Sequence, residues 1–356
     1  MTTRLVIVGG FLGAGKTTLL LAAARRLAER GYRVGLLTND QGEDLVDTAL
    51  GDQAAIPVTE VAGGCFCCRF PDLLAGLHRL QAVAAPEVVL LEPVGSCTDL
   101  VATVVRPLVQ FHGDQYQLAP LTILLDSTRD LAAFPPDVHY LYQQQLLEAE
   151  LLLLTKVDQL TPAQGDAQLA ALQTTYAHAR LLAASAHSGV GIDDWLAIVL
   201  GQRSRNPQAL VIDYARYAEA EAALGWLNVK GLVRADQDFS AQTWTDNLLT
   251  TLAHTFTAQA APIAHIKTMV HTPQGQFKAS VTQAQAPITW DLQTDDTATN
   301  RLDFLLNVRV NAAPALLEQV VIQTVETIKP DPGARYYFQH FECFSPLPPK
   351  PTHQIR

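Results

Sequence analysis

One segment constrains the fold of this chain more than any other, because residues 10–17 read Gly-Phe-Leu-Gly-Ala-Gly-Lys-Thr. They match the pattern G-x-x-x-x-G-K-[ST], whose backbone amides wrap around phosphate groups. A short apolar run, Leu5–Val8, precedes the motif, and a stretch of helical character, Thr17–Gly31, follows it. A strand, a glycine-rich turn and a helix in this order point the helix N-terminus at an anion. The sequence therefore predicts a nucleotide-phosphate site, and a chance glycine-rich turn is the disfavoured alternative.

The residue types within this phosphate-binding loop (P loop) suggest what each one does. Lys16 would reach the β and γ phosphates and stabilise charge on the transferred phosphoryl group. The Thr17 hydroxyl would bind Mg²⁺. The predicted nucleotide-binding positions in and beside the loop are Gly10, Gly13, Ala14, Gly15, Lys16, Thr17 and Thr18.

Short apolar runs alternate with helical stretches as far as Gly201. The expected strands are Leu5–Val8, Arg33–Thr38, Pro57–Val61, Val88–Leu91, Leu121–Leu125, Leu151–Leu154 and Arg180–Ser185. Apolar strands separated by helices are typical of a parallel sheet with helices on both faces. We therefore expect an α/β fold with a doubly wound, mostly parallel sheet, whose ligands bind beyond the carboxyl ends of the strands.

The order of elements changes after the polar segment Gly201–Gln208. Strands are expected at Leu224–Arg234, Ile263–His271, Gln276–Thr282, Leu302–Val310 and Arg335–Phe341, and helices at Ala241–Gln259 and Pro314–Ile328. This order resembles a small α+β sheet of the split βαβ kind. The expected organisation is a nucleotide-binding domain (1–205), a linker (206–220), a C-terminal α+β domain (221–345) with a loop at Asp291–Asn300, and a loose tail (346–356).

Charge and composition limit the kinds of partner. The formal net charge of −10 argues against nucleic acid, which favours a basic face. No apolar run approaches the ~18 residues of a membrane span. The N-terminus, Met1-Thr-Thr-Arg, carries no signal-peptide pattern. We expect a cytoplasmic protein that binds neither nucleic acid nor a membrane.

Two further segments follow expected strands. Glu92 ends one of them, where an acidic side chain should approach Mg²⁺, and Gly95 could offer its N–H to the γ-phosphate. Thr155-Lys156-Val157-Asp158 follows another strand, and Asp158 could accept hydrogen bonds from a guanine ring. An ordinary strand-end carboxylate and a charged pair at a helix start are the alternatives. Found in order after strands, the two segments favour the nucleotide interpretation.

Two shorter segments complete the predicted nucleotide site. Asp40, in Thr38–Gly42, lies where a switch segment would place a residue near Mg²⁺ or the attacking water. An Asn-Asp-Gly turn is the alternative there. Ser185-Ala186 lies after the last expected strand of the sheet, where a guanine-contacting loop belongs.

Three of the five cysteines, Cys65, Cys67 and Cys68, are crowded into one short segment after two glycines. Thiolates select Zn²⁺, Cu(I) and related ions over Mg²⁺. A closed structural zinc site takes four protein ligands, so three leave a position open for an ion that is handed on. Redox sensing and core packing are the alternatives for this cluster.

A fourth thiol, Cys97, lies two residues after Gly95. We hypothesise that Cys97 joins or leaves the metal site as that segment responds to the γ-phosphate. A small buried cysteine on the helix that follows is the alternative.

These motifs resemble the CobW-like family of P-loop GTPases, relatives of the GTPases that mature urease and nickel hydrogenase. The resemblance rests on residues Gly10–Thr17, Cys65–Cys68, Glu92–Gly95 and Thr155–Asp158. It spans roughly residues 4 to 200. It implies slow, Mg²⁺-dependent GTP hydrolysis by a domain at 1–205, coupled to delivery of a transition metal, Zn²⁺ or Co²⁺ first. The family usually has Asn where this chain has Thr155, while Lys156 and Asp158 agree.

The resemblance leaves the client open between a metalloprotein and corrinoid-related machinery, and it leaves a homodimer paired through the nucleotide face as one option. Two other functions compete with metal delivery. One is a nucleotide-binding thiol redox sensor or metal store without significant turnover. The other is a P-loop kinase of small molecules, against which the sequence shows no arginine-rich lid.

Overall fold

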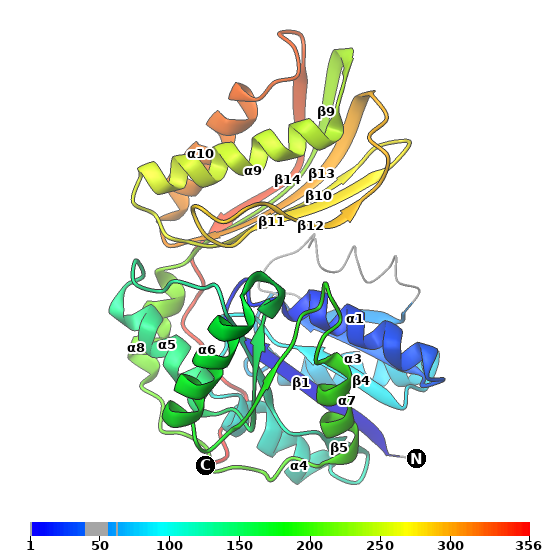
Figure 1. Ribbon diagram of the computed structural model, residues 1–356, viewed down its shortest axis with the longest axis vertical. Coiled ribbons are helices and arrows are strands. Elements are labelled where there is room, and N and C mark those ends of the chain that lie inside the picture. Colours follow the sequence, from blue (N-terminus) through cyan, green and yellow to red (C-terminus); the bar gives the residue numbers. More distant parts are fainter. Residues whose placement is uncertain (1, 40–55, 62) are drawn as a thin grey trace.

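The computed structural model describes residues 2–39, 56–61 and 63–356, and these form two sheets that lie one above the other (Figure 1). The lower sheet belongs to the nucleotide-binding domain. Its strands are β1 (Thr3–Gly10), β2 (Val34–Asn39), β3 (Val58–Val61), β4 (Val88–Glu92), β5 (Tyr116–Leu118), β6 (Thr122–Asp126), β7 (Leu151–Thr155) and β8 (Arg180–Ala183). Their order is β3-β2-β4-β1-β6-β7-β8, with β5 also on β1, and every pairing is parallel.

Helices cover both faces of this sheet. They are α1 (Lys16–Glu29), α3 (Phe70–Ala84), α4 (Arg106–His112), α5 (Pro136–Leu147), α6 (Pro162–Thr175) and α7 (Ile192–Gly201), with a π-helical turn at Val101–Val105 before α4 and a 3₁₀ turn at Val157–Gln159 after β7. Successive residues of β1 show why two layers are needed. Leu5 and Ile7 pack into the core under α3 and α5, while Val6 and Val8 pack into the core under α1 and α7. The prediction of a doubly wound parallel sheet is confirmed.

The second sheet is antiparallel. Its strands are β9 (Gly225–Phe239), β10 (Ile263–His271), β11 (Gln276–Val281), β12 (Thr289–Gln293), β13 (Thr299–Val310) and β14 (Arg335–Phe344), in the order β12-β11-β10-β13-β9-β14. Helices α9 (Ala241–Ala258) and α10 (Pro314–Thr327) cover its far face (Figure 1). Leu227 packs under these helices, whereas its neighbour Trp226 packs into the core of the nucleotide-binding domain. Around β9, both faces of this sheet therefore pack against other parts of the fold.

Several segments differ from the sequence expectations, and the short strand β5 was not expected. Helix α8 (Tyr214–Ala222) occupies the expected linker, where the Asp213 carboxylate caps its first amides. Strand β12 runs from Thr289 to Gln293 and so extends into the expected loop Asp291–Asn300, and the rings of Trp290 and Phe277 of the neighbouring strand pack edge to face. The end of the chain, expected to be loose, returns to the nucleotide-binding domain (Figure 1, red). None of the helices in the described ranges is long and apolar enough to cross a bilayer.

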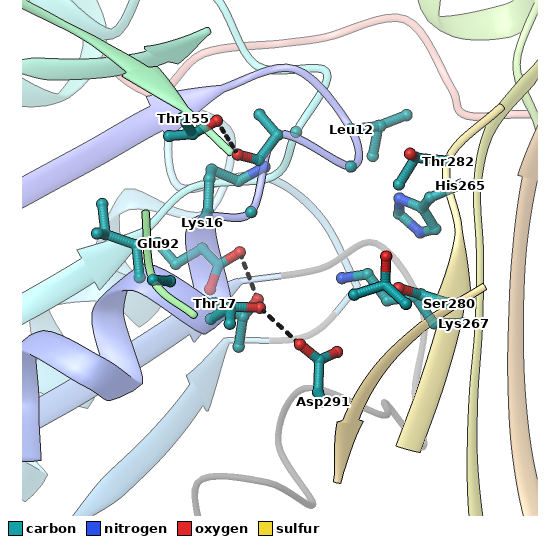
Figure 2. A pocket seen from close by; sticks show the side chains of 18 of the residues that line it. Leu12, Lys16, Thr17, Glu92, Thr155, His265, Lys267, Ser280, Thr282 and Asp291 are labelled. Carbon is teal, nitrogen blue, oxygen red and sulfur yellow. Dashed lines mark hydrogen bonds between the residues drawn. The ribbon is translucent and has the colours of Figure 1, made fainter. Parts of the chain in front are cut away.

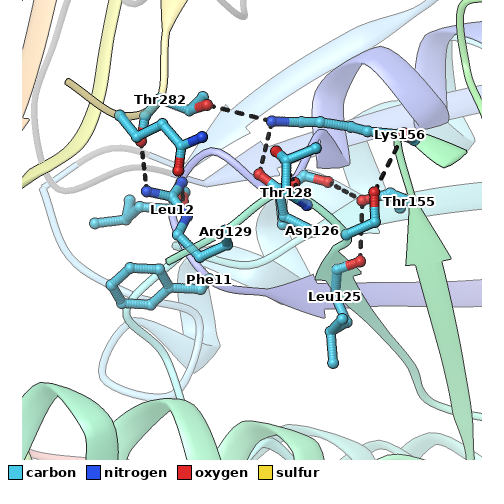
Figure 3. Close-up of polar contacts among 12 residues, drawn as sticks. Phe11, Leu12, Leu125, Asp126, Thr128, Arg129, Thr155, Lys156 and Thr282 are labelled. Carbon is cyan, nitrogen blue, oxygen red and sulfur yellow. Dashed lines mark hydrogen bonds and ion pairs between the residues drawn. The ribbon is translucent and has the colours of Figure 1, made fainter. Parts of the chain in front are cut away.

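The side chain of Arg129 joins the two domains (Figure 3). Its guanidinium donates hydrogen bonds to four backbone carbonyls, one on the P loop and three on the C-terminal sheet. The carbonyl of Leu12 accepts at 2.7 Å and that of Ala264 at 2.9 Å. Because one rigid fork of donors satisfies acceptors on both domains, the P loop is held against strands β10 and β11.

Candidate functional site

A pocket lies between the P loop and the inner face of the C-terminal sheet (Figure 2). The nucleotide-binding domain lines it with Leu12–Leu19, Thr38, Asn39, Glu92–Gly95, Thr155, Lys156, Asp158, Gln159, Ala186 and His187. The C-terminal domain adds Trp226, His265, Lys267, Lys278, Ser280, Thr282, Thr289 and Asp291. The pocket therefore collects eleven of the predicted nucleotide-binding positions and the predicted magnesium ligand Glu92. The eleven are Gly13, Ala14, Gly15, Lys16, Thr17, Thr18, Gly95, Thr155, Lys156, Asp158 and Ala186.

The P loop has the backbone shape that its glycines predict. Gly13 and Gly15 adopt positive φ of 78° and 88°, and Gly15 directly precedes the first residue of α1. A side chain at Gly13 would also meet the Ala264 carbonyl of the C-terminal sheet at 2.9 Å. Lys16 is buried, and its ammonium donates to the Gly10 carbonyl at 2.9 Å. The loop therefore presents the N-terminus of α1 and one lysine to the pocket.

Thr17 and Glu92 meet at the start of α1. The Thr17 hydroxyl donates to Glu92 Oε1 at 2.9 Å, and both side chains are buried. A hydroxyl and a carboxylate are the hard oxygen ligands that Mg²⁺ prefers beside phosphates. These two residues fit a magnesium site, as the strand-end position of Glu92 predicts.

Gly95 lies directly against the P loop. A Cβ atom at this position would be 2.7 Å from Leu12 Cδ2 and 3.0 Å from the Leu12 amide nitrogen. The carbonyls of Gly95 and Cys97 both accept from the Gln145 side chain, at 3.0 and 2.8 Å. The loop after β4 is thus packed tightly between the P loop and α5.

The opposite end of the pocket contains the segment after β7. The Thr155 hydroxyl donates to the Ala14 carbonyl at 2.9 Å, which ties this segment to the P loop (Figure 3). Lys156 adopts a positive φ of 58° and pairs with Asp126 at 2.7 Å. Although burial raises the pKa of Asp126, the charges of Lys156 and Arg129 outweigh it and leave that pKa lowered. Asp158 is exposed at the pocket, as a group that recognises a ligand must be.

Ser185, which was also predicted to be a nucleotide contact, is buried behind the pocket. Its hydroxyl accepts from the Ser188 amide at 3.0 Å and shapes the turn that presents Ala186. Gly10 likewise lies beneath the P loop, where a Cβ would strike the backbone of Leu124. Asp40 lies outside the described residues.

Sequence reasoning missed the half of the pocket that comes from the C-terminal sheet. His265 and Lys267 on β10 and Ser280 on β11 face the P loop (Figure 2), and Lys278 of β11 lines the same pocket. Polar residues two apart on a strand share one face, so this alternation was the available signal. Burial, and then the charges of Lys267 and Arg309, hold the pKa of His265 well below its ordinary value.

One carboxylate accompanies these basic groups. Asp291 of β12 points toward the start of α1 (Figure 2). It pairs with Lys278 at 3.1 Å and accepts from the Thr18 hydroxyl at 3.4 Å. It is therefore a second contact between the C-terminal sheet and the start of α1. The pocket is lined by four lysines (Lys16, Lys156, Lys267 and Lys278) and three carboxylates (Glu92, Asp158 and Asp291). The charge balance is therefore positive and favours an anionic ligand.

The three clustered cysteines form a separate site. The Sγ atoms of Cys65 and Cys67 are 2.7 Å apart, those of Cys65 and Cys68 are 3.3 Å apart, and those of Cys67 and Cys68 are 3.7 Å apart. A tetrahedral zinc ion with bonds of about 2.3 Å separates its sulfurs by about 3.8 Å. The trio thus matches a zinc site once the closest pair opens by about one ångström.

The thiols act strongly on one another. Hydrogen bonds from Cys67, then Cys68 and Cys97, lower the pKa of Cys65 well below its ordinary value. The hydrogen bond with Cys65, together with burial, raises the pKa of Cys68 to about 11. Cys97 is fully buried and belongs to the same hydrogen-bonded set, which joins the loop after β4 to the cluster. Cys97 thus interacts with Cys65 and Cys67, and its role as a metal ligand stays a prediction.

Asn39 is a positioning residue that sequence reasoning missed. Its side-chain amide donates to the carbonyls of Val61 and Gly64 at 2.8 and 2.7 Å, and its oxygen accepts from the Phe66 amide at 2.8 Å. Because Asn39 ends β2 and lines the nucleotide pocket, one side chain contacts both sites. No motif marks it, since an asparagine after a strand also occurs in ordinary turns.

Comparison with known proteins shows to which family this chain belongs. The family model described as the CobW/HypB/UreG nucleotide-binding domain matches residues 4–182. The chain belongs to this family. The CobW/HypB/UreG match contains the P loop, the three clustered cysteines, Glu92 and the segment after β7, and it ends before the C-terminal sheet.

Individual relatives extend the comparison. The zinc chaperone YeiR of Escherichia coli (strain K12) is 24% identical over 289 residues, which are 77% of this chain and 84% of that protein. The zinc chaperone YjiA of the same organism is 38% identical over 160 residues, 43% of this chain and 48% of that protein. The crystal structure of HypB from Helicobacter pylori in complex with nickel is 15% identical with a TM-score of 0.43, over 60% of this chain and 92% of that one.

Proposed function

We propose that this protein hydrolyses GTP with Mg²⁺ and couples the nucleotide to the binding and delivery of a transition metal, Zn²⁺ first and Co²⁺ second. The observation that carries the proposal is Asn39, which contacts both the thiol loop and the nucleotide pocket. Relatives named zinc chaperones support the choice of zinc. The client would be a metalloprotein or corrinoid-related machinery.

The phosphate chemistry would fall to the P loop and the end of β4. Bound Mg²⁺ would supply charge neutralisation between the phosphates, held by Thr17 and Glu92. Lys16 and the loop amides would stabilise charge on the transferred phosphoryl group. Asp40 remains our candidate for orienting the attacking water, and the Gly95 amide for contacting the γ-phosphate.

Guanine recognition would fall to the segment after β7 and the loop after β8. Asp158 is exposed at the pocket and could accept from the ring N–H groups. Lys156 and Ala186 line the same end, and Ser185 supports the turn. Thr155 would act indirectly, since its hydroxyl fixes the segment to the P loop.

The metal ion would be held by Cys65, Cys67 and Cys68, with Cys97 as a fourth ligand. The separations among the first three support this assignment. Four sulfur ligands would hold the metal ion firmly, whereas three would leave a position open for its transfer. Movement of Cys97 with the loop after β4 would therefore change the affinity of the protein for the metal ion. Pairing of two chains would need another surface or a moved sheet, because β10–β12 line the nucleotide face.

The test is titration of the reduced protein with Zn²⁺ and Co²⁺ in the presence of a GTP analogue, GDP or no nucleotide. Thiolate-bound Co²⁺ gives an intense charge-transfer absorption, so the spectrum shows whether cysteine sulfur binds the ion. We expect one equivalent to bind, with an affinity that depends on the nucleotide. Replacing Cys65, Cys67 and Cys68 by Ser should abolish binding, while Cys343→Ser, which removes a half-buried thiol on β14, should not.

A metal affinity that is the same with a GTP analogue, with GDP and without nucleotide would refute the coupling. The proposed GTP hydrolysis would then stand without metal delivery. The 2.7 Å separation of the Cys65 and Cys67 sulfurs favours redox sensing as the second candidate. That function predicts loss of thiols under mild oxidation, regained with reductant, and GTP turnover that no metal changes.

A further inference from the structure

The end of the chain lies on the thiol site. After β14 the backbone crosses from the C-terminal sheet into the nucleotide-binding domain (Figure 1, red). The Lys350 amide donates to Cys68 Sγ at 3.1 Å. The Thr352 amide donates to the Cys67 carbonyl at 2.8 Å, and the Thr352 hydroxyl donates to the Cys68 carbonyl at 3.2 Å. Three hydrogen bonds thus join this segment to two of the clustered cysteines.

Further contacts hold the segment down beyond the cysteines. The rings of His353 and Phe70 form a T-shaped pair with their centroids 4.9 Å apart. The Ile355 amide donates to the Ala102 carbonyl at 2.9 Å. The Arg356 guanidinium pairs at 2.7 Å with Asp99, whose carboxylate is buried. Contacts at both ends make residues 350–356 a fixed strap.

The strap lies where the cluster is open. Cys65, Cys67 and Cys97 are buried, whereas Cys68 is only partly so. An amide N–H that donates to a thiolate stabilises its charge and orients the sulfur, as outer-shell groups do at metal sites. We propose that the strap formed by residues 350–356 completes the thiol site and must lift for the metal ion to leave. This inference rests on the proposed metal-binding function.

The far anchor of the strap connects it to the nucleotide pocket. Asp99 lies four residues after Gly95, in the loop that packs against Leu12 of the P loop. The second oxygen of Asp99 accepts from the Tyr214 hydroxyl at 2.7 Å, so its position is defined on two sides. A shift of this loop with the γ-phosphate would move Asp99 and loosen Arg356. The nucleotide would then control the strap as well as Cys97.

Two matched pairs of variants test the strap. Lys350→Pro removes the amide hydrogen that Cys68 accepts, whereas Lys350→Ala keeps it. Arg356→Ala removes the anchor at Asp99, whereas Arg335→Ala removes an exposed arginine of β14. Each variant is assayed in two ways: by the rate at which iodoacetamide labels Cys68 in reduced, metal-free protein, and by the rate at which a chelator removes zinc with a GTP analogue or GDP bound.

We expect Arg356→Ala to raise both rates about tenfold, the effect of losing a hydrogen bond between charged groups that holds the strap down. Lys350→Pro should raise the chelation rate by a similar factor. Its labelling rate does not report on cover, because loss of the amide hydrogen also disfavours the reactive thiolate of Cys68. Lys350→Ala and Arg335→Ala should match the wild type. Arg356→Ala should also remove the difference between the two nucleotides. Wild-type rates in both test variants would overturn the inference. If the wild type binds no zinc, the proposed function fails by itself, and the labelling rate of Arg356→Ala still decides whether the strap covers Cys68.

Discussion

At the scale of the residue, short polar side chains hold the candidate sites together. Thr155 stands where the family usually has asparagine, yet its hydroxyl reaches the Ala14 carbonyl and ties the segment after β7 to the P loop. Asn39 does the same for the thiol loop, through three backbone groups. Each satisfies buried backbone groups that would otherwise be costly, so each can be tested by removing one polar atom.

Thr155→Val keeps the side-chain shape and deletes the hydroxyl. The Ala14 carbonyl then loses its partner at a cost of about 1–3 kcal/mol, and the loop that presents Lys156 and Asp158 is released from the P loop. We expect GTP and GDP to bind about tenfold more weakly by calorimetry, a change of about 1.4 kcal/mol. Thr155→Asn should retain the wild-type affinity. Equal affinity in all three proteins would show that the hydroxyl has no part in the site.

Asn39→Asp replaces a donor that faces two carbonyls with an oxygen that repels them. The thiol loop should shift, and zinc affinity should fall about tenfold, as for other changes in outer-shell groups. Competition with a chromophoric chelator measures this, and Asn300→Asp on the exposed start of β13 is the control. Unchanged zinc affinity together with a lowered melting temperature would limit Asn39 to a structural role.

At the scale of the element, patterns of apolar residues predicted strands and helices well where one face is buried. Strands β1, β4 and β7 are continuous apolar runs and were found within a residue or two. Helix α8 and strand β12 were missed because turn-forming residues surround them and their burial depends on distant partners, α5 and Phe277. The half of the pocket formed by β10–β12 was not predicted for the same reason, because no local sequence pattern shows which face of a strand packs against another domain.

Glu148, at the end of α5, gives the fold a pH dependence. Burial raises the pKa of Glu148 to about 8, while its oxygens accept from the Val101 amide and the Thr98 hydroxyl. Between about pH 4.5 and 8 the folded chain keeps a proton that the unfolded chain releases. The free energy of unfolding should therefore fall as pH rises through this range, by at most about 1.4 kcal/mol per pH unit.

Glu148→Gln should remove that contribution, and Glu29→Gln, on the exposed end of α1, should not. Denaturant unfolding of the three proteins at several pH values measures the slopes. Parallel pH profiles for the wild type and Glu148→Gln would mean that the carboxyl ionises normally in the folded protein.

At the scale of the whole molecule, the nucleotide pocket belongs to neither domain alone. The P loop supplies one wall and the inner face of the C-terminal sheet supplies the other, while the chain end returns to the thiol site. The family match ends at residue 182, so the second wall and the strap lie outside the part that defines the family. Sequence motifs could identify the chemistry of one wall, whereas the closure of the pocket follows from how the two sheets meet.

Arg129 is the side chain whose loss should separate the two walls. Arg129→Lys keeps a positive charge near Asp126 but replaces a planar fork with a single ammonium, which cannot reach all four carbonyls. With two or more charged hydrogen bonds lost, the contact between domains should weaken by about 2–4 kcal/mol. Calorimetry should then show two unfolding transitions in place of one, and a GTP analogue should merge them again if, as proposed, it binds between the two walls. Arg335→Lys, exposed on β14, is the control.

A single transition at the wild-type temperature in Arg129→Lys would contradict this prediction. It would mean that the packing of Trp226 and Met269 against the nucleotide-binding domain holds the sheets together without the guanidinium.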